Sequence, residues 1–308
     1  MIVLLTGANG QIGWELRRSL SDVGDVVALD RTTCDLSRPG DLPDVIRATK
    51  PEVIVNAAAY TDVDRAENEE HLATTVNGTA VGVMAEESRK LGGLFIHYST
   101  DYVFDGTKKS PYDEDDTPCP INAYGRSKLV GECATVQSGS DYMILRTSWV
   151  FSARGHNFLR TVLQLSAERD HLSIVADQIG APTWARHVAD ATALLVRRAC
   201  QERVEAHFTS GILNLVARGA TSWYGFAKAI LDNANARHDL LKNKPKVHPI
   251  ASSQYIRPAA RPKNSCLSSE RLRARFGLAL AEWEEALSLC MQDESLNAPR
   301  ALKRWPGV

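Results

Sequence analysis

The sequence predicts an α/β fold in which a doubly wound parallel sheet carries a smaller mixed α/β cap. In the first half, short apolar runs rich in β-branched residues alternate with longer helical patterns, which is typical of a parallel sheet covered by helices on both faces. A glycine-rich turn directly follows the first apolar run. After about Phe151 the alternation becomes irregular, which indicates a second, smaller substructure.

The first half supplies five expected strands with helices between them. The expected strands are 2–6, 26–30, 53–56, 94–98 and 142–146, and the expected helices are 11–20, 73–90 and 124–134. We therefore assign residues 1–150 to the sheet domain. Residues 151–308, with candidate strands at 172–175, 212–215 and 246–249, are assigned mainly to the cap, with some segments returning to the sheet domain.

Composition and charge limit the classes of function. A chain of 308 residues, 44% of them hydrophobic, can bury a substantial core. The 36 Lys and Arg oppose 37 Asp and Glu, so no basic field attracts nucleic acid or membranes, and a small-molecule partner is expected. Six scattered cysteines indicate reduced thiols. We find neither a signal peptide nor an apolar run of ~20 residues, and we predict a cytoplasmic protein.

The segment from Thr6 to Gly13 has the pattern Gly-x-x-Gly-x-x-Gly, between the first expected strand and the first expected helix. Gly7 permits a tight turn, Gly10 lets the backbone approach a pyrophosphate, and Gly13 leaves room where the helix crosses the strand. The helix start, with Gln11 and Ile12, offers free N–H groups to phosphates. An ordinary glycine turn is the alternative, but the position directly after a strand favours a Rossmann-type dinucleotide site.

Residues at other strand ends extend the expected cofactor site. Asp30 can accept hydrogen bonds from the adenosine ribose, whereas Arg31 can meet a 2′-phosphate. We predict NADPH as cofactor with NADH tolerated, and an ordinary solvated pair of turn charges remains the alternative. The other candidate cofactor contacts are Asp35 and Leu36 over the adenine, Ala57, Ala58 and Ala59 after the third strand, and Tyr98 in the fourth strand.

Tyr124 and Lys128 place a phenol and an amine four residues apart, on one face of a helix. Ser99, Thr100 and Asp101 follow the fourth strand, at the carboxyl edge where ligands collect in open α/β sheets. A phenol with a pKa of about 10 exchanges protons poorly near neutrality unless positive charge stabilises its ionised form, and Lys128 can supply that charge. Tyr-x-x-x-Lys also arises by chance on surface helices, but its conjunction with the two other motifs indicates catalysis.

Together these motifs resemble the short-chain dehydrogenase/reductase superfamily. The resemblance implies that Tyr124 is the acid, that Lys128 also binds the nicotinamide ribose, and that Thr100 orients the carbonyl group. Longer strings narrow the resemblance to the dTDP-4-dehydrorhamnose reductase family, over nearly the whole chain. These strings lie at 10–16, 55–64, 99–106, 124–132, 145–151, 177–183 and 261–265.

The resemblance implies reduction of the C4 ketone of dTDP-4-dehydro-β-L-rhamnose to dTDP-L-rhamnose. The expected partner is a dTDP-4-keto-6-deoxysugar, bound by a monomer or homodimer, with Thr100, Asp101 and Tyr124 against the sugar. Trp149 is expected near the sugar nucleotide and Arg261 at its diphosphate. A core tryptophan and an arginine paired with a carboxylate are the respective alternatives.

Other activities of related proteins remain open to different degrees. Sugar 4,6-dehydratases generally carry an acidic pair after the active-site threonine, and Tyr102 here argues against dehydration. A reductase or epimerase of another nucleotide-linked 4-keto sugar stays an alternative. A non-catalytic regulatory subunit, as found among relatives of the methionine adenosyltransferase regulatory subunit, is disfavoured because Thr100, Tyr124 and Lys128 are retained together.

Metal binding is a doubtful expectation. Some family members hold Mg²⁺ at a dimer interface through acidic side chains, and Glu15 fits one such ligand. Arg186 stands where an acidic partner is expected, and a cation there would repel the metal. We interpret His97, in an apolar strand, as a core residue rather than a catalyst.

Overall fold

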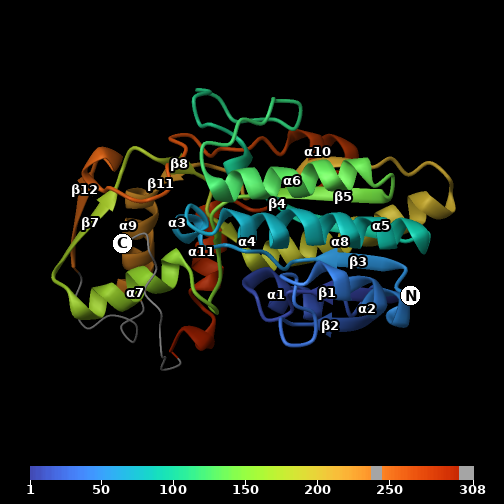
Figure 1. The fold of residues 1–308 in the computed structure, drawn as a ribbon. Helices are drawn as coiled ribbons and strands as arrows, with labels where there is room; N and C mark the ends of the chain where they lie inside the picture. Colours follow the sequence, from blue (N-terminus) through green and yellow to red (C-terminus); the bar gives the residue numbers. More distant parts are fainter. Residues whose placement is uncertain (237–244, 298–308) are drawn as a thin grey trace.

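A six-stranded parallel sheet forms the centre of the computed structural model, which describes residues 1–236 and 245–297 (Figure 1). The strand order is β10-β5-β4-β3-β1-β2, and every neighbouring pair is parallel. The strands are β1 (Ile2–Thr6), β2 (Asp25–Leu29), β3 (Val53–Asn56), β4 (Leu94–Thr100), β5 (Asp141–Thr147) and β10 (Gly211–Asn214). β1 pairs with β2 on one side and with β3 on the other, so the direction of winding reverses between β1 and β3. Ligands bind in open α/β sheets at such a switch point.

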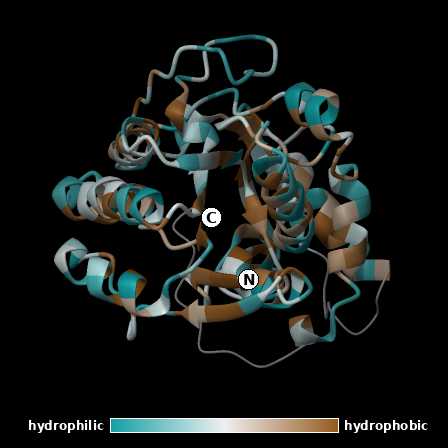
Figure 2. Ribbon diagram, turned by 90° about the vertical axis from the view of Figure 1, so that its right-hand side faces the viewer, coloured by the Kyte–Doolittle hydropathy of each residue, from teal (hydrophilic) through white to brown (hydrophobic). Residues whose placement is uncertain are grey.

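Helices cover both faces of this sheet. Alternate residues of β1 separate the two apolar layers, since Val3 and Leu5 pack in one cluster and Leu4 packs in the other. The first layer is covered by α1 (Gln11–Ser19), α8 (Ala185–Val204) and α10 (Glu270–Phe276), and the second by α2 (Leu42–Thr49) and α5 (Ala80–Lys90). α6 (Ala123–Gln137) lies beside α5. Figure 2 shows the largely hydrophobic strands between helices that turn hydrophilic residues outward.

The predicted fold class and all five predicted strands of the first half are confirmed. β10, which overlaps the candidate strand 212–215 of the second half, adds a sixth strand to the sheet beside β5. The expected single helix 73–90 is wrong. It is divided into α4 (Glu70–Thr74), a π-helical turn (Thr75–Thr79) and α5.

A second, smaller body of structure lies at the left of Figure 1, around its own apolar cluster. Its helices are α7 (Phe158–Glu168), α9 (Trp223–Ala236) and α11 (Trp283–Cys290). β7 (His171–Val175) pairs in parallel with β12 (Lys246–Ile250). Shorter pairs join β6 (Val150–Phe151) to β9 (Thr183–Trp184) and β8 (Ile179–Gly180) to β11 (Thr221–Ser222). The remaining short helices are α3 (Val63–Ala66) and the 3₁₀ turns 39–41, 101–103, 252–254 and 294–297.

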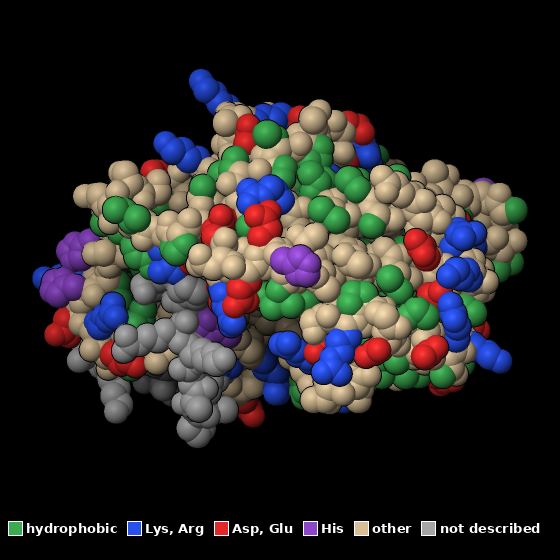
Figure 3. Space-filling view, in the orientation of Figure 1, with side chains coloured by type: hydrophobic (Ala, Val, Ile, Leu, Met, Phe, Trp, Pro, Cys, Tyr) green, Lys and Arg blue, Asp and Glu red, His purple; other side chains and the backbone are tan. Residues whose placement is uncertain are grey.

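The surface carries charges of both signs. Figure 3 shows lysine and arginine interspersed with aspartate and glutamate over the face in view, so no extended field of one sign forms there. All six cysteines are free thiols. Within residues 1–236 and 245–297, none of the helices is both long enough and apolar enough to cross a bilayer.

Candidate active site

The glycine turn lies at the switch point of the sheet, between the carboxyl ends of β1 and β3. Gly7 has a φ of +72°, and a Cβ there would stand 2.5 Å from the backbone nitrogen of Ala58. A Cβ on Gly13 would stand 2.0 Å from the carbonyl oxygen of Gly7. Only glycine permits this packing of turn, helix and neighbouring loop. Gly10 caps α1 without a side-chain hydrogen bond, so the first N–H groups of the helix, from Gln11 and Ile12 on, remain available to an anion.

The residues predicted to hold the adenosine lie directly after β2. The Asp30 carboxylate accepts hydrogen bonds from the backbone N–H of Thr32 (2.9 Å) and the side-chain amide of Asn9 (2.9 Å). The Thr32 hydroxyl also donates to this carboxylate (2.6 Å). The hydrogen bonds, that of the Thr32 hydroxyl first, hold the pKa of Asp30 below its ordinary value, so the carboxyl group is ionised at neutral pH. Arg31 is 81% exposed and lies 3.6 Å from Asp35. Its guanidinium is therefore accessible at the rim.

The other predicted cofactor residues divide between this rim and the core. Ala57, Ala58 and Ala59 follow β3 beside the glycine turn, and the Ala57 N–H donates to the carbonyl oxygen of Thr6 (3.2 Å). Leu36 is buried in the apolar layer under α2. Tyr98 is also buried, and its phenol is hydrogen-bonded to Thr192 of α8 (2.6 Å), so only its backbone faces the site.

Tyr124 of α6 lies beside the end of β4. The Thr100 hydroxyl donates to the Asp101 carboxylate (3.0 Å) and accepts from the backbone N–H of Tyr102 (3.1 Å). Thr100 also acts on Tyr124, where it lowers the pKa of the phenol against the larger effect of burial. Burial raises the pKa of Tyr124 well above its ordinary value, so the phenol is protonated. Burial raises the pKa of Asp101 to about 6.

Three side chains that we did not single out from the sequence position the start of α6. Asn122 caps the helix by accepting a hydrogen bond from the Gly125 N–H (2.7 Å), and its amide donates to the carbonyl oxygen of Ala260 (2.8 Å). Glu67 accepts a hydrogen bond from the Ala123 N–H (2.8 Å). Asn77, in the π-helical turn, donates to Ser127 (2.9 Å). An asparagine two residues before Tyr124 is an N-cap signal that sequence analysis could have used.

Lys128 lies one helical turn after Tyr124 and is only 2% exposed. Its Nζ donates to the backbone carbonyl oxygen of Tyr98 (2.6 Å) and lies 3.3 Å from Nε2 of His97. Burial lowers the pKa of Lys128 to about 7, and the charge of Glu132 opposes part of that shift. The interpretation of His97 as a buried residue agrees with its 0% exposure, but the ring contacts the predicted active-site lysine.

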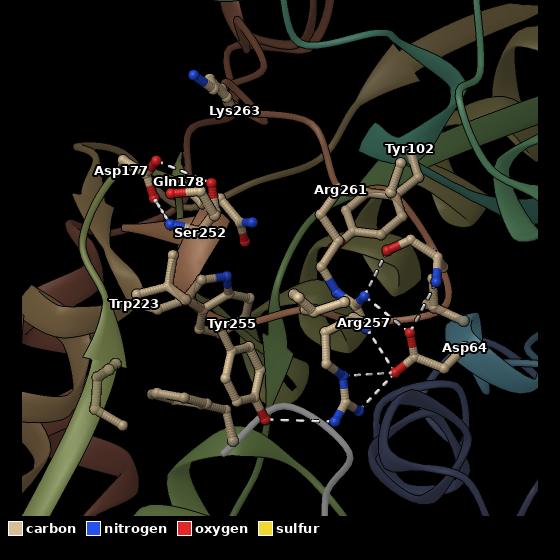
Figure 4. Close-up of a pocket in the computed structure, with 18 of the residues that line it drawn as sticks. Asp64, Tyr102, Asp177, Gln178, Trp223, Ser252, Tyr255, Arg257, Arg261 and Lys263 are labelled. Carbon is tan, nitrogen blue, oxygen red and sulfur yellow. Dashed lines mark hydrogen bonds and ion pairs between the residues drawn. The ribbon is translucent and has the colours of Figure 1, made fainter. Parts of the chain in front are cut away.

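A cleft of about 770 Å³ adjoins this centre (Figure 4). Tyr102 lines it, and the Tyr102 ring stands edge-on to the ring of Tyr124, with centroids 6.0 Å apart. The volume suits a nucleotide-sized ligand. Asp177 and Ser252 meet on one side of the cleft, and Asp64 with Arg257 lies on the other.

Arg261, the predicted diphosphate contact, lines this cleft but is bound to a carboxylate. Its guanidinium donates to both oxygens of Asp64 (2.9 Å each). Arg257 donates to the same carboxylate (2.6 and 3.1 Å). Desolvation raises the pKa of Asp64, but the two arginines outweigh it and lower that pKa overall. Around Asp64 two cations therefore face one anion, while the cleft lining as a whole also includes Asp62, Asp177 and Lys263.

Trp149 lies just beyond β5 with a φ of +46°. Its ring stacks on Trp223 with centroids 3.5 Å apart, and Trp223 lines the cleft. The Trp149 ring also packs directly against Gly180. A Cβ at Gly180 would come within 2.5 Å of the ring atoms. Trp149 is thus built into the wall of the second body.

The residues present do not fit the Mg²⁺ site considered above. Arg186 donates to Glu15 (3.0 Å) and to Asp293 (3.2 Å), so a guanidinium already neutralises the candidate carboxylate. Over the ranges 1–236 and 245–297, no cluster of three or more His, Cys, Asp or Glu side chains is arranged to hold a metal ion.

The fold and this constellation define an NAD(P)-dependent oxidoreductase of the extended short-chain dehydrogenase/reductase class. A family model described as "RmlD substrate binding domain" matches residues 1–296. A dTDP-4-dehydrorhamnose reductase of Burkholderia thailandensis is 53% identical over 95% of this chain and 99% of its own length, and that of Salmonella typhimurium is 42% identical over 92% and 95%. The chain belongs to the dTDP-4-dehydrorhamnose reductase family.

Solved structures agree with this assignment. A dTDP-4-dehydrorhamnose reductase from Bacillus anthracis, in complex with NADP, superposes with a TM-score of 0.84 at 34% identity, over 94% of this chain and 98% of that one. A second, from Clostridium acetobutylicum, gives 0.85 at 32% identity, over 94% and 98%.

Proposed function

We propose that this protein reduces the C4 ketone of dTDP-4-dehydro-β-L-rhamnose to dTDP-L-rhamnose with NADPH. The observation that carries the proposal is the placement of Tyr124 near Thr100 at the carboxyl end of β4 and edge-on to Tyr102, which lines the cleft. The class of reaction follows from this arrangement. The identity of the sugar rests on the family, with relatives of that name at 53% and 42% identity.

The chemistry that NADPH would supply when bound is transfer of a hydride to the carbonyl carbon. Tyr124 donates its proton to the carbonyl oxygen, so the ketone gains a hydride and a proton and leaves as the alcohol. Thr100 orients the carbonyl group when its hydroxyl turns from the Asp101 carboxylate to the substrate oxygen. Lys128 holds the nicotinamide ribose through its remaining N–H groups. The glycine turn and the start of α1 hold the pyrophosphate.

The cleft receives the sugar nucleotide. The paired guanidinium groups of Arg257 and Arg261 face the diphosphate, while Asp64 keeps them in place. Tyr102 lies between this wall and Tyr124, so the sugar extends past Tyr102 to the reaction centre. Trp223, supported by the Trp149 ring, supplies an aromatic surface within reach of the ligand.

The direct test follows NADPH absorbance while dTDP-4-dehydro-β-L-rhamnose is generated in place. We expect oxidation of NADPH in step with formation of dTDP-L-rhamnose, identified by NMR of the new C4–H. Turnover that yields the C4 epimer would assign the protein to the alternative class of reductases for other 4-keto sugars. Cofactor binding without turnover would favour the regulatory alternative.

Gly7→Ala is expected to weaken NADPH binding at least ~10-fold. The new Cβ would meet the Ala58 backbone at 2.5 Å, in a φ region that costs a non-glycine residue about 1–3 kcal/mol, so the turn must move. Fluorescence titration with NADPH measures the change. Gly40→Ala is the matched control, because a Cβ at Gly40 meets nothing within 4 Å. Equal binding by the two variants would contradict the assignment of this turn.

Arg31→Ala is expected to raise the Kd for NADPH about tenfold and to leave the Kd for NADH nearly unchanged. The exposed Arg31 guanidinium can reach a 2′-phosphate, and a charge-assisted hydrogen bond of about 1.5 kcal/mol corresponds to that factor. Arg38→Ala, a nearby cation after the same turn, serves as control. A parallel loss for both cofactors would refute the 2′-phosphate contact.

We also propose that the protein works in the cytoplasm. Its six free thiols fit a reducing compartment, where pyridine-nucleotide reductases operate.

A further inference from the structure

One buried polar side chain in the wall of the cleft makes no hydrogen bond. Gln178 lies between β7 and β8, lines the cleft and is 8% exposed. Within the described ranges 1–236 and 245–297, its amide has no hydrogen-bond partner. A primary amide has two N–H donors and a carbonyl acceptor, and burial without partners is unfavourable for such a group. The unpaired amide therefore indicates a place where a ligand completes the hydrogen bonds.

The backbone on both sides of Gln178 is held in place. The carboxylate of Asp177, the preceding residue, accepts hydrogen bonds from the backbone N–H (2.7 Å) and the hydroxyl (2.9 Å) of Ser252. The N–H of Ile179, the following residue, donates to the carbonyl oxygen of Lys263 (2.8 Å). Both oxygens of Asp177 are thus engaged, whereas the amide of Gln178 is available. A polar group on a fixed backbone loses little conformational freedom when a ligand binds.

The position of Gln178 in the cleft determines which part of the ligand it can reach. Figure 4 shows Gln178 beside Asp177 and Ser252, on the side of the cleft away from Tyr102 and Arg261. In the proposed function the diphosphate lies at Arg261 and its neighbouring arginine, and the sugar extends past Tyr102 to the reaction centre. Since sugar and nucleoside are attached to opposite ends of the diphosphate, the nucleoside extends towards the wall that carries Gln178.

The chemistry of this wall suits a pyrimidine nucleoside. Thymine presents an N–H donor between two carbonyl acceptors, and deoxyribose presents a hydroxyl group, so both complement the donors and the acceptor of an amide. The same cleft is lined by Ile174 and Val175 of β7 and by the rings of Phe158 and Trp223. These apolar surfaces can cover the faces of a planar base, while Gln178 supplies a polar contact.

We propose that Gln178 binds the thymidine half of the sugar nucleotide through its side-chain amide and so determines where the nucleotide lies in the cleft. The inference rests on the proposed reductase function, because that function supplies the position of the diphosphate. Gln178 takes no part in the transfer of hydride or proton. Its amide contributes to binding of the sugar nucleotide and not to binding of NADPH.

Gln178→Met tests the proposal, because methionine nearly matches the length of glutamine and carries no amide. Calorimetric titration of the protein saturated with NADP⁺ measures the Kd of dTDP. We expect this Kd to rise about tenfold, the effect of one or two uncharged hydrogen bonds, and the Kd of inorganic pyrophosphate, measured by competition, to change less than about twofold. Gln164→Met is the matched control, since the Gln164 amide donates to Glu168 on α7 (3.0 Å).

The stability of the free protein separates ligand binding from a structural role. An amide without a partner contributes no hydrogen bond to the fold, so Gln178→Met should keep or raise the free energy of unfolding. Denaturant titration without ligands measures this quantity. A marked loss of stability, together with equal weakening of dTDP, pyrophosphate and NADPH, would show that Gln178 supports the fold, and it would overturn the proposal.

Other binding patterns also contradict the inference. An unchanged Kd of dTDP in Gln178→Met would exclude a contact with the nucleoside. Equal weakening of dTDP and pyrophosphate would assign the amide to the diphosphate. A loss of affinity seen with dTDP-L-rhamnose and not with dTDP would assign it to the sugar.

The binding experiments need no turnover, so the two proposals can fail separately. If the amide is required for dTDP affinity but no ketone is reduced, the reductase function alone is wrong. If the protein is an active reductase and Gln178→Met binds dTDP as the parent does, this inference alone is wrong. In an active protein, the KM of the sugar nucleotide should rise about tenfold in Gln178→Met while kcat changes less than about twofold.

Discussion

Tyr124→Phe is expected to lower kcat by about 10²–10⁴-fold while the Kd for NADPH changes by less than about twofold. The substitution removes the one proton donor at the carbonyl oxygen and keeps the ring, so the edge-on packing against Tyr102 persists. Stopped-flow or steady-state NADPH oxidation measures kcat, and fluorescence titration measures binding.

Tyr142→Phe is the matched control for this prediction. Tyr142 is the second residue of β5, at the end of the strand opposite the candidate active site. The substitution removes a phenolic hydroxyl group there, as it does at Tyr124. Its kcat should stay near that of the parent. If Tyr124→Phe kept more than about a tenth of the parent kcat, proton donation by Tyr124 would be wrong and another donor, with Asp101 the nearest acid, would have to be sought.

Glu132→Gln is expected to destabilise the protein by about 3–5 kcal/mol. Glu132 and Arg146 form a buried ion pair with two hydrogen bonds, and their side chains are 3% and 1% exposed. The amide leaves the Arg146 charge uncompensated in a buried site. The loss is measured as the change in free energy of unfolding by denaturant titration.

An exposed pair supplies the control for this second prediction. Glu270 and Arg273 are 70% and 66% exposed, and Glu270→Gln should cost no more than about 0.5 kcal/mol. The double substitution Glu132→Leu with Arg146→Met removes both charges and should recover most of the stability lost in Glu132→Gln. A loss in Glu132→Gln as small as that of the control would show that the pair contributes nothing.

Local signals explain how much of this molecule could be predicted. The first strand, the glycine turn and α1 follow each other within a few residues. At Gly7, Gly10 and Gly13 a side chain would collide with nearby backbone atoms, so the glycine pattern itself is informative. β1, β3 and β4 are short apolar runs that are almost completely buried, so their pattern alone identifies them, whereas the edge strand β2 is largely exposed. The grouping of Thr100 with Tyr124 and Lys128 was predicted from the conjunction of three motifs and from the superfamily that these motifs resemble.

Contacts between distant segments explain what could not be predicted. The π-helical turn interrupts an otherwise helical pattern because the Asn77 side chain binds the backbone of Tyr60 and the hydroxyl of Ser127. No periodicity within 73–90 encodes these partners. Likewise, Asp64 binds Arg257 and Arg261, which lie almost two hundred residues further along the chain. The sequence of the short strand β10 does not indicate that β5 is its partner.

The place of β10 affects how the nascent chain folds. When β5 has been synthesised, β4 is the one neighbouring strand with which it can pair. Its other edge stays unpaired until residues 211–214 have been made. During that interval α7, β7 and α8 are synthesised, so the outer rim of the sheet closes only after much of the ligand-facing half exists. An unpaired edge strand invites association with other chains. Completion of the sheet therefore depends on a segment of the second half.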